Sequence, residues 1–251
     1  MRNLGRGSVA AMTDPDEGVE RILVVAAHPD DIDFGSAGSI ATWTAEGIEV
    51  VYCLVTDGDA GGSDRDMSRT EMAELRRAEQ TAAAKVVGVT ELEFLAYPDG
   101  RVQPTIELRR DISRVIRQVR PQRVIGMSPE RNYQRIYASH PDHLATGEAT
   151  LAAVYPDSRN PFAHPELLQE EGLEPWTVPE VWMVAISEPD TFVDTTDEFD
   201  RKLEALHCHV SQHPDPDSLE ELLRAWGGML AQRAGYPEGH LAEGFLRVVT
   251  T

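Results

Sequence analysis

The chain has 251 residues, and 43 acidic against 23 basic residues give it a formal net charge of −20. Such an acidic surface repels phosphate backbones and anionic lipids, which argues against a nucleic-acid or membrane-surface partner. No stretch approaches the roughly 20 consecutive apolar residues that a membrane-spanning helix needs. The two cysteines, Cys53 and Cys208, form no CxxC pair. We therefore expect a cytoplasmic protein without membrane insertion, disulfides or a cysteine metal site.

The first 19 residues contain no long apolar run and predict a flexible leader, and residues 20–251 are expected to form one domain. Short apolar runs predict strands at 22–27, 48–58, 91–96, 123–127 and 181–187. Helical patterns lie between or after them at 39–47, 70–87, 105–120, 144–155, 196–211 and 218–234. This alternation is typical of an α/β, Rossmann-like fold with a mostly parallel sheet and helices on both faces.

Two histidine–aspartate motifs follow predicted strands. An HPDD motif at 28–31 comes directly after the first strand, and an HPDH motif at 140–143 follows the fourth strand and begins a helix. Ligands of open parallel sheets bind beyond the carboxyl ends of the strands. Each motif alone could be a turn with a helix cap. Two such clusters at one sheet edge are costly to bury unless a metal or substrate pairs them. Their imidazole and carboxylate groups suit catalytic zinc or ferrous iron.

The sequence around both motifs resembles a known family. AAHPDDIDFGSAGSIA (26–41) and SHPDHLATGEATLAAV (139–154) are similar to the two signature motifs of the LmbE-like, or PIG-L, zinc-dependent N-deacetylases. The resemblance extends from about residue 21 to residue 212. Ile32 stands where the first motif usually has an acidic residue, a position that is not a ligand in the family. The resemblance implies a hydrolase that removes the acetyl group from an N-acetylglucosamine-type amino sugar.

The resemblance also implies roles for individual residues. It assigns the metal, Zn²⁺ with Fe²⁺ as the alternative, to three ligands: His28, Asp31 and His143. Asp30 is then the general base that activates a water molecule, and His140 polarises the developing oxyanion or supports protonation of the leaving amine. These residue types suit an amide substrate, a poor electrophile that needs a Lewis acid and a proton acceptor beside the water. We expect carboxylates such as that of Asp142 to raise the pKa of His140.

Three further residues match family positions that contact or face the substrate: Arg76, Asp99 and His209. Each also has an ordinary structural interpretation. Arg76 could lie on an exposed helix face, paired with Glu79 three residues later. Asp99, in a PDG sequence, could form a type I turn, and His209 could pack between helices.

Two other functions remain open. A relative of the same family could act as an amidase on a cysteinyl-glucosamine conjugate of the mycothiol type. A sugar- or nucleotide-binding protein could use the same sheet edge without catalysis. A Rossmann dehydrogenase is disfavoured, because no G-x-G-x-x-G sequence follows the first strand. The predicted partner is a small amino-sugar substrate, and a homo-oligomer remains an open expectation.

Overall fold

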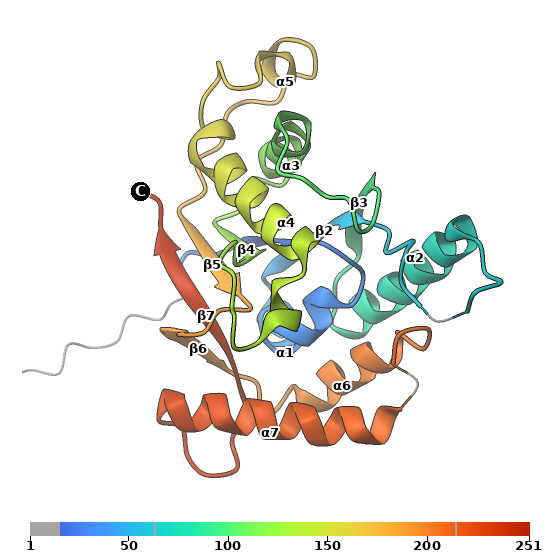
Figure 1. Ribbon diagram of the computed structural model, residues 1–251. Helices are drawn as coiled ribbons and strands as arrows, with labels where there is room; N and C mark the ends of the chain where they lie inside the picture. The colour runs from blue at the N-terminus through green and yellow to red at the C-terminus, as the bar shows by residue number, and fades with distance from the viewer. Residues whose placement is uncertain (1–15, 63, 214) are drawn as a thin grey trace, which may run out of the picture.

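A seven-stranded sheet forms the centre of the molecule (Figure 1), in the order β3-β2-β1-β4-β5-β7-β6. The computed structural model describes residues 16–62, 64–213 and 215–251. Five neighbouring strands are parallel: β1 (Arg21–Ala26), β2 (Glu49–Thr56), β3 (Glu91–Tyr97), β4 (Arg123–Met127) and β5 (Glu180–Val184). All five were predicted. Their central members β1, β2 and β4 are almost wholly buried, as expected for strands covered on both faces.

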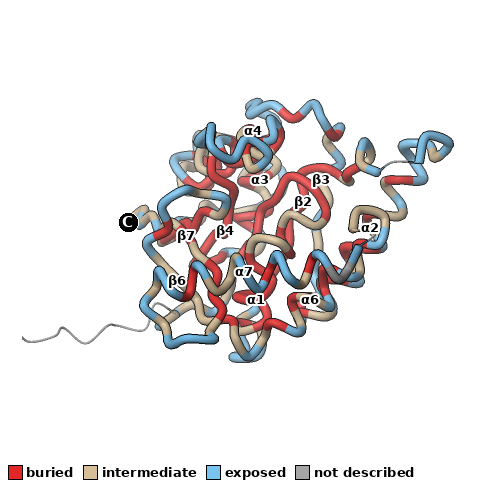
Figure 2. Tube along the Cα trace, turned by 60° about the horizontal axis from the view of Figure 1, so that its bottom comes forward, coloured by how far each residue is buried: buried red, intermediate tan, exposed pale blue. Residues whose placement is uncertain are grey.

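Helices cover both faces of the sheet, and Figure 2 shows the buried strands between them. One face packs against α1 (Asp31–Ala45), α2 (Arg69–Val86) and α6 (Phe199–His207). The other packs against α3 (Ile106–Val119) and α4 (Pro141–Ala152). Alternate β1 residues enter the two cores, Ile22 and Val24 on one side and Leu23 and Val25 on the other. The predicted α/β fold is confirmed.

The last two strands of the sheet were not predicted. β7 (Ala242–Val249) runs antiparallel to β5, and β6 (Thr191–Asp194) runs antiparallel to β7. Alternate residues of β7 are partly exposed towards its end, and every residue of β6 is half-buried. Such strands lack the continuous apolar run that identifies a doubly covered strand. The long helix α7 (Pro216–Ala234) contacts both β6 and β7. The short helix α5 (Pro165–Gln169) lies between α4 and β5 in the sequence.

Several helices begin earlier than predicted, and two of these starts concern the motifs. α1 begins at Asp31 rather than residue 39, and α4 begins at Pro141 rather than residue 144. Gly35 and Gly38 favoured the later start of α1, but Gly38 serves close packing. A Cβ atom at Gly38 would lie only 2.8 Å from Cβ of Thr195. The early start of α1 places Asp31 in the first turn of a helix, and the HPDH motif begins α4, as predicted.

Asp16 lies inside the predicted leader and yet contacts the folded chain. Its carboxylate pairs with Nη1 of Arg123 at 2.5 Å and accepts a hydrogen bond from Nε1 of Trp43 at 3.2 Å. The contacts of the folded chain therefore begin before the predicted boundary at residue 20, and residues 1–15 of the predicted leader lie outside the described residues. Among the residues that the structure describes, no helix is long and apolar enough to cross a bilayer.

Candidate metal centre

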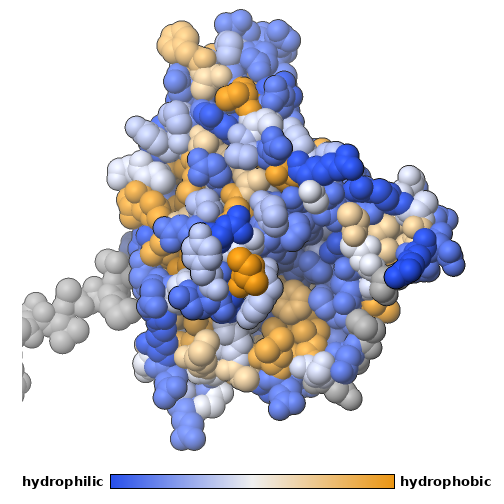
Figure 3. All heavy atoms as spheres, in the orientation of Figure 1, coloured by the Kyte–Doolittle hydropathy of each residue, from blue (hydrophilic) through white to orange (hydrophobic). Residues whose placement is uncertain are grey.

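Both motifs follow neighbouring strands, β1 and β4, from which the chain continues to opposite sides of the sheet. The chain leaves β1 for β2 on one side and leaves β4 for β5 on the other, so β1 and β4 are neighbours at a topological switch point. Open α/β sheets bind their ligands in the crevice at such a point. On the face seen in Figure 3 the surface is hollowed near the middle, and the walls of the hollow are mostly hydrophilic.

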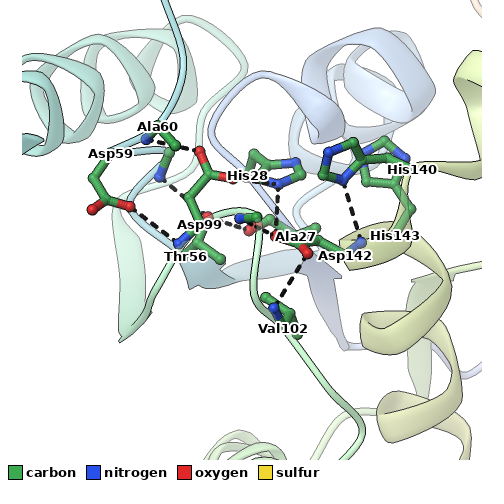
Figure 4. A network of polar contacts seen from close by, with 12 residues as sticks. Ala27, His28, Thr56, Asp59, Ala60, Asp99, Val102, His140, Asp142 and His143 are labelled. Atoms are coloured by element: carbon green, nitrogen blue, oxygen red, sulfur yellow. Dashed lines mark hydrogen bonds and ion pairs between the residues drawn. The ribbon is translucent and has the colours of Figure 1, made fainter.

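The small residues of α4 allow its first turn to reach this crevice. Gly147 packs so closely on the end of β4 that a Cβ atom there would lie 2.4 Å from the carbonyl oxygen of Met127. His140 is the N-cap residue of α4, and Pro141 occupies its first turn, as helix starts favour. The helix therefore presents His140 and His143 beside His28 (Figure 4), with ring centroids 5.0 and 5.2 Å from that of His28.

Asp31 lies between two histidines. Its Oδ2 is 3.1 Å from Nδ1 of His28, and its Oδ1 is 3.0 Å from Nε2 of His143. The three predicted metal ligands thus converge on one carboxylate. Burial disfavours the ionised carboxylate, but His143 and His28 outweigh this effect and hold the pKa of Asp31 well below its usual range.

The other nitrogen of His28 faces two more carboxylates. Its Nε2 is 3.2 Å from Oδ1 of Asp99 and 3.4 Å from Oδ2 of Asp142 (Figure 4). The Asp142 carboxylate also accepts hydrogen bonds from the backbone N–H groups of Gly100 and Val102, at 2.7 and 3.2 Å. Asp142 is fully buried, so these bonds fix its position.

The surroundings of His28 fit a bound cation. Burial opposes a charged imidazole, yet Asp31, Asp142 and Asp99 together raise the pKa of His28 from 6.5 to about 12. The site therefore favours positive charge at this ring. A metal ligated by Nδ1 would supply that charge, and the N–H at Nε2 would then point to carboxylates. This is the usual orientation of a metal-binding histidine.

Two overlapping groups of donor atoms could hold a divalent ion. One nitrogen each of His28, His140 and His143 lies within 4.8 Å of the others, and one donor atom each of His28, Asp99 and Asp142 does so as well. His28 belongs to both groups. Which residues coordinate the ion therefore stays a prediction, as does the set of His28, Asp31 and His143.

The side chain of Asp30 has other partners than that of Asp31. Its φ of 89° is a left-handed conformation that is rare for a residue with a side chain. Its Oδ2 lies 3.2 Å from Nη2 of Arg76 and 3.5 Å from Nε2 of His213. The adjacent carboxylates therefore have different partners: Asp31 has two histidines of the motifs, and Asp30 has a buried guanidinium.

The environment of His140 differs from the prediction. Burial and the repulsion of His28 and His143 lower its pKa, and the attraction of Asp142 is too weak to reverse this. Asp142 raises the pKa of His140 as expected, but the net shift is downward, because burial and the two neighbouring imidazoles outweigh its attraction. The backbone N–H of Asp142 donates to Nδ1 of His140 at 3.2 Å, which leaves the proton of a neutral ring on Nε2.

The three predicted substrate contacts occupy different places. Arg76 is not on an exposed helix face, because only 4% of it is accessible and its guanidinium donates to the carbonyl oxygens of Pro29 and Gly58 at 2.5 and 3.2 Å. Asp99 lies at the centre beside His28. His209 is wholly buried, and its Nε2 lies 2.8 Å from Oδ2 of Asp33. Direct contact of these residues with substrate stays a prediction.

Sequence reasoning missed two residues that reach Asp30. His213 follows His209 by four residues in the same segment, and this spacing was the available signal. Gln80 accepts a hydrogen bond from the backbone N–H of Asp30 at 2.8 Å. A lone glutamine within a polar helix gives no sequence signal of such a contact.

Comparison with known proteins agrees with this geometry. Residues 23–154 match the family model described as PIG-L, GlcNAc-PI de-N-acetylase. The chain belongs to the PIG-L family. Its sequence is 33% identical to a diacetylchitobiose deacetylase of Thermococcus kodakarensis, over 93% of this chain and 85% of that protein. It is 29% identical to a probable N-acetyl-alpha-D-glucosaminyl L-malate deacetylase of Bacillus cereus, over 76% and 83% of the two chains.

A solved structure of a PIG-L relative has the same architecture. N,N'-diacetylchitobiose deacetylase from Pyrococcus horikoshii superposes with a TM-score of 0.85 and 30% identity, covering 94% of this chain and 86% of that one.

Proposed function

We propose that this member of the PIG-L family is a zinc-dependent hydrolase that removes the acetyl group from an N-acetylglucosamine-type amino sugar. The observation that carries the proposal is the Asp31 carboxylate between His28 and His143, at 3.1 and 3.0 Å, with Asp30 held beside it by other partners. The deacetylase names of the relatives support the same reaction. Burial of so many ionisable groups at one sheet edge is costly without a cation and a substrate.

We assign the metal to His28, Asp31 and His143. Two imidazoles and one carboxylate suit Zn²⁺, with Fe²⁺ as the alternative, and three protein ligands leave a position open for catalysis. When bound, such an ion supplies a Lewis acid for the amide carbonyl and makes water a stronger acid.

The protein's own groups then move the protons. The Asp30 carboxylate accepts a proton from the attacking water and returns one to the departing amine nitrogen. Arg76 and His213, 3.2 and 3.5 Å from Oδ2 of Asp30, orient that carboxylate. His140 acts as a neutral ring: its lowered pKa disfavours the imidazolium, and its Nε2–H donates a hydrogen bond to the carbonyl oxygen as negative charge develops there.

Mass spectrometry can test the reaction directly. The purified, zinc-loaded protein is incubated with a panel of N-acetylglucosaminides, including diacetylchitobiose, and with one cysteinyl-glucosamine conjugate. We expect the loss of one acetyl group and release of acetate. Cleavage of the conjugate alone would favour the amidase alternative. Metal binding without any turnover, on a panel that a known deacetylase hydrolyses, would favour a sugar-binding protein.

The finer assignments of location and assembly stay predictions. We propose that the enzyme acts in the cytoplasm, that residues 20–251 fold as one domain and that a homo-oligomer can form. Cell fractionation, limited proteolysis and light scattering measure these properties independently of activity.

A further inference from the structure

The peptide group between Pro29 and Asp30 is held from both sides by one helix. Its carbonyl oxygen accepts from Nη2 of Arg76 at 2.5 Å, and its N–H donates to Oε1 of Gln80 at 2.8 Å. Arg76 and Gln80 are four residues apart on α2, so their side chains share one face of the helix. Both are buried, with 4% and 0% of their surface accessible.

Asp30 needs such support because its backbone is strained. A non-glycine residue at a φ of 89° is in an unfavourable backbone conformation, which persists only when the surrounding structure fixes it. Rotation of the Pro29–Asp30 peptide would relieve the strain and would also move the Asp30 carboxylate. The two hydrogen bonds from α2 oppose that rotation.

The orientation of the Gln80 amide is fixed in turn. Its Nε2 donates to Oδ2 of Asp33 at 2.9 Å, and Nε2 of His209 lies 2.8 Å from the same oxygen. Asp33, Gln80 and His209 all have 0% accessible surface. The Asp33 oxygen accepts from the NH₂ end of the amide, which turns the amide oxygen towards the Asp30 N–H.

We propose that Gln80 is a positioning residue for Asp30, and that Asp33 and His209 set its orientation. This inference rests on the proposed function, in which Asp30 is the general base. The side-chain amide of Gln80 bonds to the Asp30 N–H and to Asp33, and not to the predicted ligands His28 and His143. Its effect on the site therefore passes through the Pro29–Asp30 peptide. The burial of His209 is explained by this role and needs no contact with substrate.

The test compares two glutamines with the same type of contact. Gln122 accepts hydrogen bonds from the backbone N–H groups of Arg21 and Glu20 at 2.8 and 3.2 Å, at the opposite end of β1. Gln80→Leu and the control Gln122→Leu each remove a side-chain acceptor of a backbone N–H. For both variants we measure kcat, KM, zinc content, thermal unfolding and hydrogen–deuterium exchange of the peptide covering residues 26–36.

For Gln80→Leu we expect kcat to fall about 100-fold, as a misplaced catalytic group does, with KM and zinc content within about threefold of wild type. Its peptide 26–36 should also gain one rapidly exchanging amide. Gln122→Leu should change neither kcat nor exchange of this peptide. A second variant, Gln80→Glu, has nearly the same shape and keeps an oxygen that can accept from the Asp30 N–H. We expect it to recover at least about tenfold of the lost kcat.

Several results would overturn the proposal: a folded Gln80→Leu variant with normal kcat, a loss confined to KM or zinc content, or an equal loss in Gln122→Leu. If Gln80→Leu fails to fold, a folded Gln80→Glu variant with normal kcat and unprotected exchange of the Asp30 amide refutes it. If the wild-type protein deacetylates nothing, the proposed function fails, and the exchange of the Asp30 amide alone decides whether Gln80 holds this peptide.

Discussion

The separation of Asp30 from Asp31 predicts opposite consequences for two adjacent, chemically identical substitutions. Asp31→Asn replaces by an amide a carboxylate whose two oxygens lie 3.1 and 3.0 Å from His28 and His143. Asp30→Asn alters a carboxylate whose partners are Arg76 and His213. The first variant should lose metal, whereas the second should keep metal and lose its proton acceptor.

The expected losses of kcat and of zinc affinity follow from the proposed role of each carboxylate. Loss of a general base lowers kcat by about 10²–10⁴-fold, which corresponds to roughly 3–5 kcal/mol of barrier for Asp30→Asn. Asp142 lies behind His28, 3.4 Å from its Nε2, and partners of a metal-binding histidine contribute about 10–100-fold to metal affinity. Asp142→Asn should therefore weaken zinc binding by that factor. Asp31→Asn should weaken it by more than about 100-fold, because a ligand itself is impaired.

Competition with a fluorescent zinc chelator measures the zinc dissociation constants of the wild type and the three variants, and steady-state kinetics at saturating zinc measures kcat. The expected order of zinc affinity is wild type equal to Asp30→Asn, then Asp142→Asn, then Asp31→Asn. Equal metal loss in Asp30→Asn and Asp31→Asn would refute the division of roles. Wild-type kcat in Asp30→Asn would show that another group accepts the proton.

Three further predictions concern packing and charge. Gly147→Ala should lower both thermal stability and zinc affinity, because the added methyl group displaces α4 from the end of β4; calorimetry and chelator competition measure the two effects. Lys202→Met should destabilise the fold by about 3–5 kcal/mol in urea unfolding, since it leaves the buried Glu243 carboxylate without its cation. Burial opposes the charge of Asp111, but Tyr97 and Arg114 lower its pKa, so its ionised form stabilises the folded state above pH 4 and this contribution is lost as the pH falls. Asp111→Asn should therefore lower the urea midpoint at pH 7 and change it less at pH 3.

The parallel part of the fold could be predicted because its strands are buried on both faces. Val50 to Val55 of β2, for example, form one apolar run without a polar interruption. β7 begins with buried residues and ends with half-buried and exposed residues in alternation, and β6 has only four half-buried residues. Antiparallel strands of this kind need a search for alternation rather than for continuous apolar runs.

The centre was predictable where its residues lie together in the sequence. The two motifs bring six histidines and aspartates to neighbouring strand ends. The surroundings of Asp30 were not predictable, because they form only when the loop after β2 packs over Arg76 of α2. Glycines allow this close packing: a Cβ atom at Gly58 would lie 2.3 Å from Nη1 of Arg76. A glycine-rich loop and an arginine ten or more residues later give no sequence signal that the loop will bury the guanidinium.

The charge partners of the two adjacent aspartates explain why one can bind metal and the other can act as a base. A divalent ion attracts both carboxylates of an Asp-Asp pair, and coordination by both would leave no proton acceptor. Arg76 carries a permanent cation 3.2 Å from the Asp30 carboxylate, so this guanidinium competes with the metal for that side chain alone. The φ of 89° turns Asp30 to this partner, while Asp31 begins α1 and faces the two histidines. The fold thus gives each carboxylate different partners, which supports the proposed division of roles.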